Sequence, residues 1–530
     1  MMAIANLVSR ITGFLRQIAL FAVLGATVLN DAYTVSNTLP NIVYEFLIGG
    51  VLSSVMIPLL VRAQTEDPDG GERYTRRLFT LAGAALLVAT ALSMAAAPLL
   101  TSLYISSDGN RELATAFAYL LLPQIVFYGL GALMGALLNT KGSFGAFAWA
   151  PVLNNIVVLV VLAVYVAVPG EISLDPVRMG DAKLLVLGIG TTLGIVAQTL
   201  VLLPAMRRIG FRYRPVWGWD SRMTATGGLA LWAIAYVLIG AIGLNVTTQV
   251  ATAADGGAYV VYANSWLLLQ VPYGVLGVSL LTALMPRMSR AAAEGRTGDV
   301  VDDLSLGSRL STVFLLPLAA FFTAFGPAIG VALFGWRSSG VEGAAQIGLA
   351  LACSAFGLVP YAITLLQLRV FYALTDGRIP ALIQLVTVLV KVPLLLICPL
   401  LLPPKDVVLG LVAANAVSFI AGALVGQVLL RRRLGSVRAR EVLNTLWRTL
   451  VAAALAALAA RGVVALLGPM SGLAPLARAW IQVVVGALLW LPLTVVGLRL
   501  LRVAELDPVV RRLAGLAARF DPRRGGDRGR

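Results

Sequence analysis

Fourteen apolar segments, each long enough to cross a bilayer, follow one another along this chain of 530 residues. A hydrocarbon core about 30 Å thick needs about 20 mainly apolar residues in a helix, and a helix satisfies its own backbone hydrogen bonds. Only 12% of the residues are charged, too few for a soluble domain of this size. We therefore predict an all-α, polytopic membrane protein with about 14 transmembrane helices. The approximate bounds of the segments are 3–25, 31–61, 77–104, 113–139, 146–168, 183–206, 224–252, 257–286, 308–335, 343–374, 379–403, 406–430, 441–466 and 475–502.

The positive charges of the loops predict how these helices are oriented. Lysine and arginine are about threefold more frequent in one set of alternating loops than in the other, and loops rich in them lie in the cytoplasm. The even number of segments puts both termini on that side. We expect a multi-pass protein of the cytoplasmic (plasma) or inner membrane with both termini in the cytoplasm. The basic residues after 504 are expected to lie near the anionic inner surface.

Two sequence matches indicate an internal repeat. The string MIPLLVRA at 56–63 resembles LMPRMSRA at 284–291, and ALLNTK at 136–141 resembles ALTDGR at 373–378. Both matches shift by six segments, an even number, so the repeat is parallel and forms two six-helix lobes. We predict an N-lobe of helices 1–6 at 1–215, a C-lobe of helices 7–12 at 216–435, two extra helices at 436–503, and a basic cytoplasmic tail at 504–530.

The first segment carries two arginines, Arg10 and Arg16, at membrane depth. A charge there costs roughly 2.5–3.5 kcal/mol and is tolerated mainly where it faces water or a partner. At about 100° per residue, Arg10 shares a helix face with Asn6, Gly13 and Gln17, and Arg16 flanks that face. This cationic stripe predicts a cavity that receives an anion. The alternative is that the arginines extend to the lipid headgroups, which suits Arg10 better than Arg16.

Further polar side chains lie within later apolar segments. In the second segment Asp31, Asn37, Asn41 and Glu45 accompany Pro40, which interrupts the helical hydrogen bonds. The candidate site also includes Gln270, Arg369 and Lys391 from the second half of the chain. For Arg369 an extended, headgroup-reaching side chain is an equal alternative. In the fifth segment, Asn154 and Asn155 are expected to make interhelical hydrogen bonds.

Several classes of function are disfavoured by what the chain lacks. There is no histidine, and the two cysteines, Cys353 and Cys398, lie in apolar segments where they read as buried thiols. No paired-carboxylate cluster lies on an outer loop, and no Walker A loop or GxSxG motif occurs. The net charge of +16 follows membrane topology and does not indicate nucleic acid. We predict that the chain is not an enzyme and has neither a catalytic centre nor a bound metal.

Four groups of residues carry a resemblance to a known family. The strings LVSRITGFLR at 7–16, DAY at 31–33 and LPN at 39–41 resemble the opening of the MurJ (MviN) family of lipid II flippases. APVLNN at 150–155 resembles its fifth helix, VPYGVLGV at 271–278 its eighth, and RVFYALTD at 369–376 its tenth. The family belongs to the multidrug/oligosaccharidyl-lipid/polysaccharide exporter superfamily, and this pattern is similar to an actinobacterial branch. Members of that branch carry further cytoplasmic domains, and the sequence leaves open whether such domains follow residue 530.

The resemblance implies that the chain flips the undecaprenyl-pyrophosphate-linked peptidoglycan precursor, lipid II, from the cytoplasmic to the outer leaflet. The family's arginines in helix one map to Arg10 and Arg16, and its acid in helix two maps to Asp31. Guanidinium groups suit this cargo because they pair with a pyrophosphate through two hydrogen bonds each. The family's arginine pair after LPN is replaced here by Tyr44 and Glu45, and its arginine and glutamate in helix eight by Leu267 and Gln270. Arg369 and Lys391 are candidates to compensate.

The expected mechanism is alternating access, with the lipid tail in a groove lined by the two extra helices. No cofactor is expected, and membrane potential or a sodium or proton gradient is expected to reset the cycle. Expected partners are lipid II, membrane lipids and cell-wall synthesis proteins. The alternatives are an exporter of another lipid-linked oligosaccharide, a cation or drug antiporter, which would need an acidic cavity, and a non-transporting scaffold.

Overall fold

The computed structural model describes most of the chain, and all of the regular structure in the described part is helical. The described residues are 2–45, 57–106, 108–174, 177–218, 220, 227–274, 278–336, 340–374, 376–435, 437–468, 472–503 and 505. They form two compact units. The chain passes from one unit to the other within α12 (Ala258–Pro272), α15 (Val341–Ser354) and α18 (Val407–Leu434), and also after residues 335 and 376. The fold class predicted from the apolar segments, an all-α membrane protein, is confirmed.

Unit 1 contains residues 1–264, 336–343 and 377–411. Its helices pack mainly as α1 on α8, α2 on α6, α4 on α7, α8 on α9 and α11 on α17. Two of these helices, α11 and α17, come from the predicted lobe at 216–435; the division into lobes itself stays a prediction. The helices are α1 (Met2–Leu24), α2 (Val28–Glu45), α3 (Ile57–Glu66), α4 (Glu72–Ala95), α5 (Ala97–Tyr104), α6 (Asp108–Leu121), α7 (Gln124–Thr140), α8 (Gly145–Ala167), α9 (Ala182–Leu200), α10 (Leu203–Arg208), α11 (Gly227–Ala254) and α17 (Arg378–Leu401).

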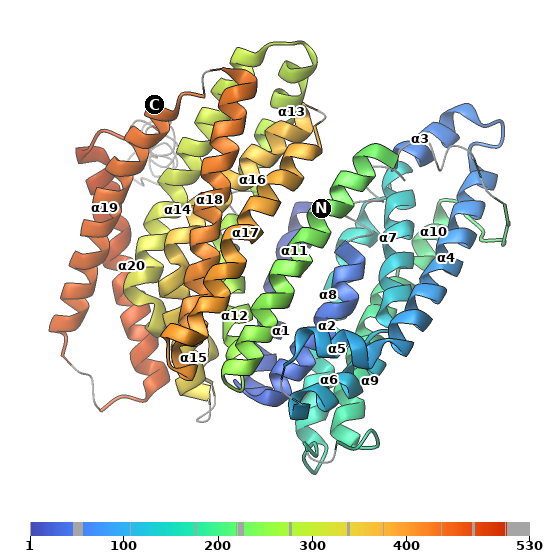
Figure 1. The fold of residues 1–530 in the computed structure, drawn as a ribbon, viewed down its shortest axis with the longest axis horizontal. Coiled ribbons are helices and arrows are strands. Elements are labelled where there is room, and N and C mark those ends of the chain that lie inside the picture. The colour runs from blue at the N-terminus through green and yellow to red at the C-terminus, as the bar shows by residue number, and fades with distance from the viewer. Residues whose placement is uncertain are drawn as a thin grey trace, which may run out of the picture. The chain divides into compact units, whose positions relative to one another are not determined.

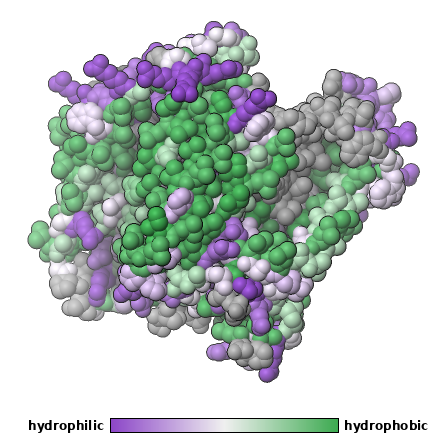
Figure 2. Space-filling model, in the orientation of Figure 1, coloured by the Kyte–Doolittle hydropathy of each residue, from purple (hydrophilic) through white to green (hydrophobic). Residues whose placement is uncertain are grey.

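Unit 2 is built around the long helix α14 (Thr297–Phe334). The helices α19 (Ala439–Leu466) and α20 (Pro475–Leu500) pack side by side against α14 (Figure 1). Small residues allow this packing, since Ala452, Ala453, Ala456, Ala457 and Ala460 of α19 are all buried. The surface of this unit in view is hydrophobic over the middle of its helices and hydrophilic at their ends (Figure 2). Its remaining helices are α13 (Val278–Ala293), α15 (Val341–Ser354) and α16 (Leu358–Ala373).

Eleven helices among the described residues are long and apolar enough to cross a membrane, or up to 12 if a bent pair is one span. The bent pair is 110–121 with 124–140, which turns by 42° just where Pro123 removes a backbone donor. Three of the fourteen predicted segments, 31–61, 224–252 and 257–286, include residues that lie outside the described ones, namely 46–56, 224–226 and 275–277. The count of about 14 is therefore not confirmed.

Candidate functional site

The two arginines of the first helix both lie on α1. Arg10 is exposed and Arg16 is half-buried, and neither makes an ion pair within the described part of the chain. Asn6 on the same stripe is exposed, while Gln17 is half-buried. With no described carboxylate on either guanidinium group, their donors suit an anion. Arg16 also lies near enough to Tyr33 of α2 to act electrostatically on its phenol.

A buried amide fixes α1 against α8. Asn155 Nδ2 donates to the carbonyl of Ser9 at 3.2 Å and to Thr12 Oγ1 at 3.0 Å. Gly13 leaves room for this amide, because a Cβ there would lie 3.4 Å from Asn155 Nδ2. The predicted interhelical hydrogen bond of Asn155 is confirmed. Since Arg16 follows Gly13 by three residues, the anchor also fixes where Arg16 emerges from the helix.

The second helix is positioned by its buried aromatic residue, Tyr33. Its hydroxyl lies 3.0 Å from Thr191 Oγ1 of α9, and its ring meets Phe117 of α6 edge-on at a centroid distance of 5.7 Å. The Thr191 hydroxyl donates to the carbonyl of Leu187, so Tyr33 is the donor to Thr191. These contacts hold α2 against α6 and α9 on the side of unit 1 where Arg16 lies.

Asp31 makes a buried cap for another helix. Its carboxylate accepts hydrogen bonds from the backbone amides of Gly257 at 2.7 Å and Val260 at 2.8 Å, at the start of α12. The side chain is fully buried. A carboxylate in this place satisfies donors that a helix N-terminus leaves unpaired and complements the helix dipole. Both oxygens are therefore engaged by the protein itself, and a role in substrate binding stays a prediction.

Asn37 and Asn41 lie one turn apart on α2, on either side of Pro40, which the helix includes without a break. Asn41 Nδ2 donates to the carbonyl of Asn37 at 3.2 Å. Asn37 Oδ1 is buried and accepts no hydrogen bond from the described residues. Asn37 Oδ1 could therefore accept a hydrogen bond from a ligand. Neither asparagine adds positive charge to the site. The side chain of Glu45 lies outside the described residues, so its role stays a prediction.

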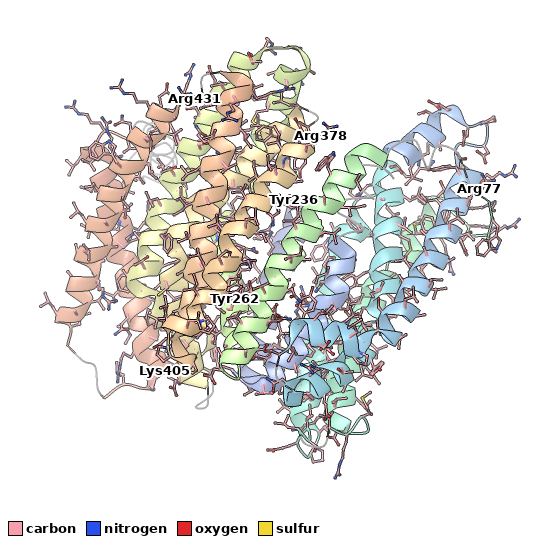
Figure 3. The ribbon with its side chains drawn as sticks, in the orientation of Figure 1. Arg77, Tyr236, Tyr262, Arg378, Lys405 and Arg431 are labelled. Carbon is pink, nitrogen blue, oxygen red and sulfur yellow. The ribbon has the colours of Figure 1, made fainter. Side chains whose placement is uncertain are left out.

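Lys391 is a buried cation in unit 1. It is 9% exposed, and its ammonium lies 5.9 Å from the centroid of the Tyr262 ring. Its aliphatic stem lies against Gly243 of α11. In Figure 3, Arg378 begins α17 and Lys405 lies in the turn after its end, and Lys391 lies roughly 20 Å along the helix from Arg378. No acidic partner for Lys391 occurs among the described residues, so the aromatic ring is its electrostatic contact.

Unit 2 holds the other two predicted site residues, Arg369 and Gln270. Arg369 on α16 is exposed, and Gln270 on α12 is half-buried. Arg369 lies within electrostatic range of Tyr273 and Tyr372. The structure therefore brings Arg10, Arg16, Asp31, Asn37, Asn41 and Lys391 into unit 1, and Gln270 and Arg369 into unit 2.

Four aromatic rings that the sequence does not predict to be neighbours form a cluster in unit 2, and one of them, Tyr273, is within electrostatic range of Arg369. Tyr361 lies 5.2 Å from Trp266, 5.2 Å from Tyr273 and 4.9 Å from Phe419, measured between ring centroids. Trp266 and Tyr273 stand out within their segment, but Tyr361 and Phe419 come from α16 and α18, far along the chain. Only a prediction of how the helices pack could have shown that these four residues are neighbours. Aromatic faces next to a guanidinium suit a ligand with both apolar and anionic parts.

The cations of the candidate site suit recognition of an anion. Within the described residues no group of three or more histidine, cysteine, aspartate or glutamate side chains is placed to hold a metal ion. Arg10, Arg16, Arg369 and Lys391 lie on apolar helices, and none of them pairs with a carboxylate among the described residues.

A family model and individual relatives match the same protein family over most of the chain. A family model described as "Lipid II flippase MurJ" matches residues 20–471. The probable lipid II flippase MurJ of Rhizobium meliloti (strain 1021) is 28% identical over 485 residues, covering 89% of this chain and 87% of that protein. The lipid II flippase MurJ of Burkholderia cenocepacia is 26% identical over 392 residues, covering 71% of this chain and 72% of that protein.

Solved structures share the fold. One described as "Lipid II flippase MurJ, inward closed conformation" superimposes with a TM-score of 0.74 at 18% identity, over 94% of this chain and 98% of that chain. An inward-facing multidrug resistance MATE family transporter of the MOP superfamily gives a TM-score of 0.63 at 17% identity, over 82% of this chain and 99% of that chain. At sequence identities this low, the similarity to these structures supports the fold and not a shared function.

Proposed function

Because this chain belongs to the lipid II flippase MurJ family, we propose that it moves the lipid II headgroup across the membrane by alternating access. The family resemblance carried by the sequence motifs is confirmed. The chain is a multi-span protein of the inner membrane, and its family activity is transport rather than enzymatic catalysis. Lipid II is the substrate that the family membership implies.

Arg10 and Arg16 bind the pyrophosphate of the headgroup in this proposal. The observation that carries it is that both guanidinium groups lie at membrane depth with no carboxylate partner within the described residues. A guanidinium offers paired donors that match phosphate oxygens, and water excluded from a membrane cavity strengthens the attraction. The anchor of α1 through Asn155 supports the proposal because it orients Arg16 before the ligand arrives.

The direction of transport in this proposal is the one that the family membership implies, from the cytoplasmic leaflet to the outer leaflet. The positive loops support only the orientation of the chain, with both termini in the cytoplasm. Lys391, Arg369, Gln270, Asn37 and Asn41 are proposed to contact the headgroup during this passage. Membrane potential, or a sodium or proton gradient, is proposed to return the empty transporter, and the helices α19 and α20 to guide the lipid tail.

The proposal is tested by rescue of growth in a strain depleted of its own lipid II flippase. The wild-type chain is expected to restore growth, and the double variant Arg10→Ala/Arg16→Ala is expected to fail. Each lost charged hydrogen bond is worth about 1.5–3 kcal/mol, roughly tenfold or more in headgroup binding. Arg431→Ala/Arg433→Ala, at the exposed end of α18, is the matched control and should restore growth. Full rescue by the Arg10/Arg16 variant at equal abundance contradicts the proposed anion site.

A further inference from the structure

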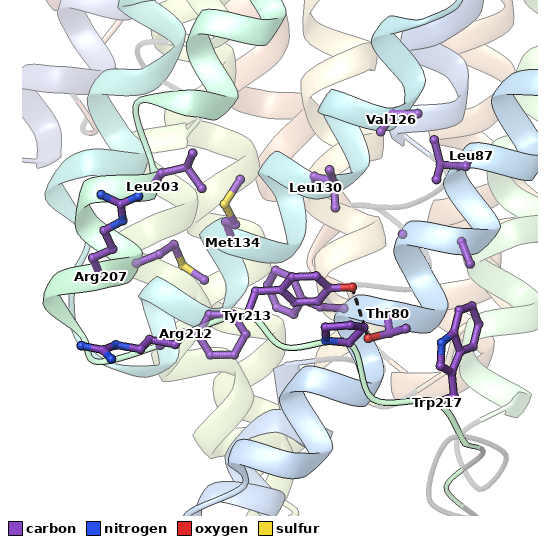
Figure 4. A pocket seen from close by; sticks show the side chains of 16 residues that line it. Thr80, Leu87, Val126, Leu130, Met134, Leu203, Arg207, Arg212, Tyr213 and Trp217 are labelled. Carbon is purple, nitrogen blue, oxygen red and sulfur yellow. Dashed lines mark hydrogen bonds between the residues drawn. The ribbon is translucent and has the colours of Figure 1, made fainter.

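Unit 1 contains a large cavity on the predicted cytoplasmic side of its helices. The cavity measures about 1040 Å³ and lies between α4, α7, α10 and the segment at 209–218 (Figure 4). That volume is at the upper end for small-ligand pockets. None of the predicted site residues lines it.

The segment at 209–218 forms one wall of the cavity and is held in place across α4. The hydroxyl of Tyr213 lies 3.3 Å from Thr80 Oγ1, and the amide of Val216 donates to the same oxygen at 3.0 Å. The Phe211 ring packs on Phe79 at a centroid distance of 5.1 Å. Arg76 Nε donates to the carbonyl of Arg212 at 3.1 Å. Four contacts over one short segment make a defined wall.

The interior of the cavity is apolar and has room near α4. Val126, Leu130 and Met134 line it from α7, and Leu87 from α4. A Cβ built on Gly83 would meet no heavy atom within 4 Å. From Thr80 to Leu87 the wall of α4 rises roughly 10 Å toward the membrane interior. Leu87 is 61% exposed on a membrane-spanning helix, so this end of the cavity borders the lipid.

The opposite end of the cavity is basic. In Figure 4, Arg207 and Arg212 lie at the end away from Leu87 and Val126. Both are exposed, and neither makes an ion pair within the described residues. The nearby acids are already engaged, because Glu72 pairs with Arg76, and Asp220 with Arg77 at 3.7 Å. The cavity is therefore long, apolar inside and positively charged at its cytoplasmic end.

We propose that this cavity binds one anionic phospholipid of the inner leaflet, with an acyl chain along α4 and α7 and the phosphate at Arg207 and Arg212. Burial of the acyl chain's methylenes against these apolar side chains favours binding. The two guanidinium groups select a negatively charged headgroup and sit where the leaflet's headgroups lie. The hydrogen bonds from the segment at 209–218 to α4 fix the backbone at Arg212, which positions its guanidinium group for the phosphate.

The test uses native mass spectrometry of the full chain released from detergent, with dioleoyl phosphatidylglycerol and dioleoyl phosphatidylcholine as paired probes. The wild-type protein is expected to retain one phosphatidylglycerol and about tenfold less phosphatidylcholine. Gly83→Leu, which fills the open space, should lower phosphatidylglycerol retention about tenfold. Gly462→Leu on α19, also in open space, is the matched control and should retain the wild-type level. Arg207→Gln/Arg212→Gln should remove the preference between the two lipids.

The melting temperature of each variant is also measured. If Gly83→Leu does not fold, Gly83→Val, which fills less of the space, takes its place. Three results would overturn the proposal. The wild type retains both lipids equally, or Gly83→Leu and Gly462→Leu behave alike, or undecaprenyl phosphate displaces phosphatidylglycerol at equal concentration. The last result would assign the cavity to a polyprenyl lipid.

Discussion

Asp31 shows how a residue that looks functional in the sequence acquires a structural partner in the fold. An acid at the start of an apolar segment suggests a ligand contact, and the family resemblance, which maps an acid of helix two onto Asp31, supports that interpretation. The structure adds that Gly257 and Val260, more than two hundred residues later, donate to its carboxylate. Sequence periodicity describes one helix at a time and carries no information on such a distant pair.

Replacing Asp31 by asparagine is expected to destabilise the protein. One amide oxygen would remain to accept a hydrogen bond, and the amide nitrogen would face a backbone donor. Leaving one buried donor unpaired costs about 1–3 kcal/mol. Thermal unfolding of the purified variant measures this, with Asp69→Asn in an exposed turn as control. An unchanged melting temperature for Asp31→Asn would mean that the cap contributes nothing.

Lys391 is a cation whose place in the middle of an apolar segment predicts that it faces a cavity or pairs with an acid. The structure shows that it is buried, and its contact with substrate stays a prediction. The sequence could not predict that an aromatic ring rather than a carboxylate lies beside it, since Tyr262 belongs to another helix. A lone buried charge reduces stability, which makes it a candidate for function.

Lys391→Met is expected to raise the melting temperature and to lower transport. Methionine keeps the length of the side chain but removes the desolvated charge, a gain of about 1 kcal/mol or more. The same change at exposed Lys405 should leave both quantities near the wild-type values. A lower melting temperature for Lys391→Met would show that the ammonium stabilises the fold.

At the scale of elements, hydropathy predicts the helices well and their interruptions less well. The predicted segment 77–104 is divided into α4 and α5 at Ala96, because Pro98 at the start of α5 lacks a backbone donor. The predicted segment 308–335 begins earlier, at Thr297, because a hydropathy count excludes the first turns with Asp299, Asp302 and Asp303. Helix existence follows from apolar length, whereas helix ends and partners depend on packing.

The crossing of α14 and α15 depends on glycines that let the backbones touch. A Cβ on Gly348 would lie 2.1 Å from the carbonyl oxygen of Gly326, and a Cβ on Gly330 would lie 2.2 Å from that of Ala344. Small residues permit such close approach, where packing rather than hydrophobic burial holds membrane helices together.

Gly348→Ala is expected to destabilise unit 2, because the added methyl collides with backbone that has no rotamer to change. Overpacking of this kind costs about 1–3 kcal/mol. Thermal unfolding in detergent and the yield of folded protein measure it. Gly462→Ala, in open space, is the control and should be neutral or slightly stabilising. Equal stability of the two variants would contradict the close crossing.

At the scale of the whole molecule, the two units divide the charged residues between them. Arg10, Arg16 and Lys391 belong to unit 1, and Arg369 with its aromatic cluster belongs to unit 2. Alternating access requires two bodies that each contact the cargo, and each unit carries its own cations at membrane depth. The sequence predicts these cations one by one, because each lies within an apolar segment. It does not predict that Lys391 joins the unit of the first arginines, since helix pairing such as that of α11 with α17 is set by packing.

The most direct test of the central claim is headgroup translocation in proteoliposomes. Purified protein receives labelled lipid II, and an impermeant probe reads its appearance in the opposite leaflet. We expect the wild-type chain and Arg431→Ala/Arg433→Ala to translocate lipid II, and Arg10→Ala/Arg16→Ala to fall to the level of empty vesicles while remaining folded. Translocation by the Arg10/Arg16 variant at the wild-type rate would contradict the account.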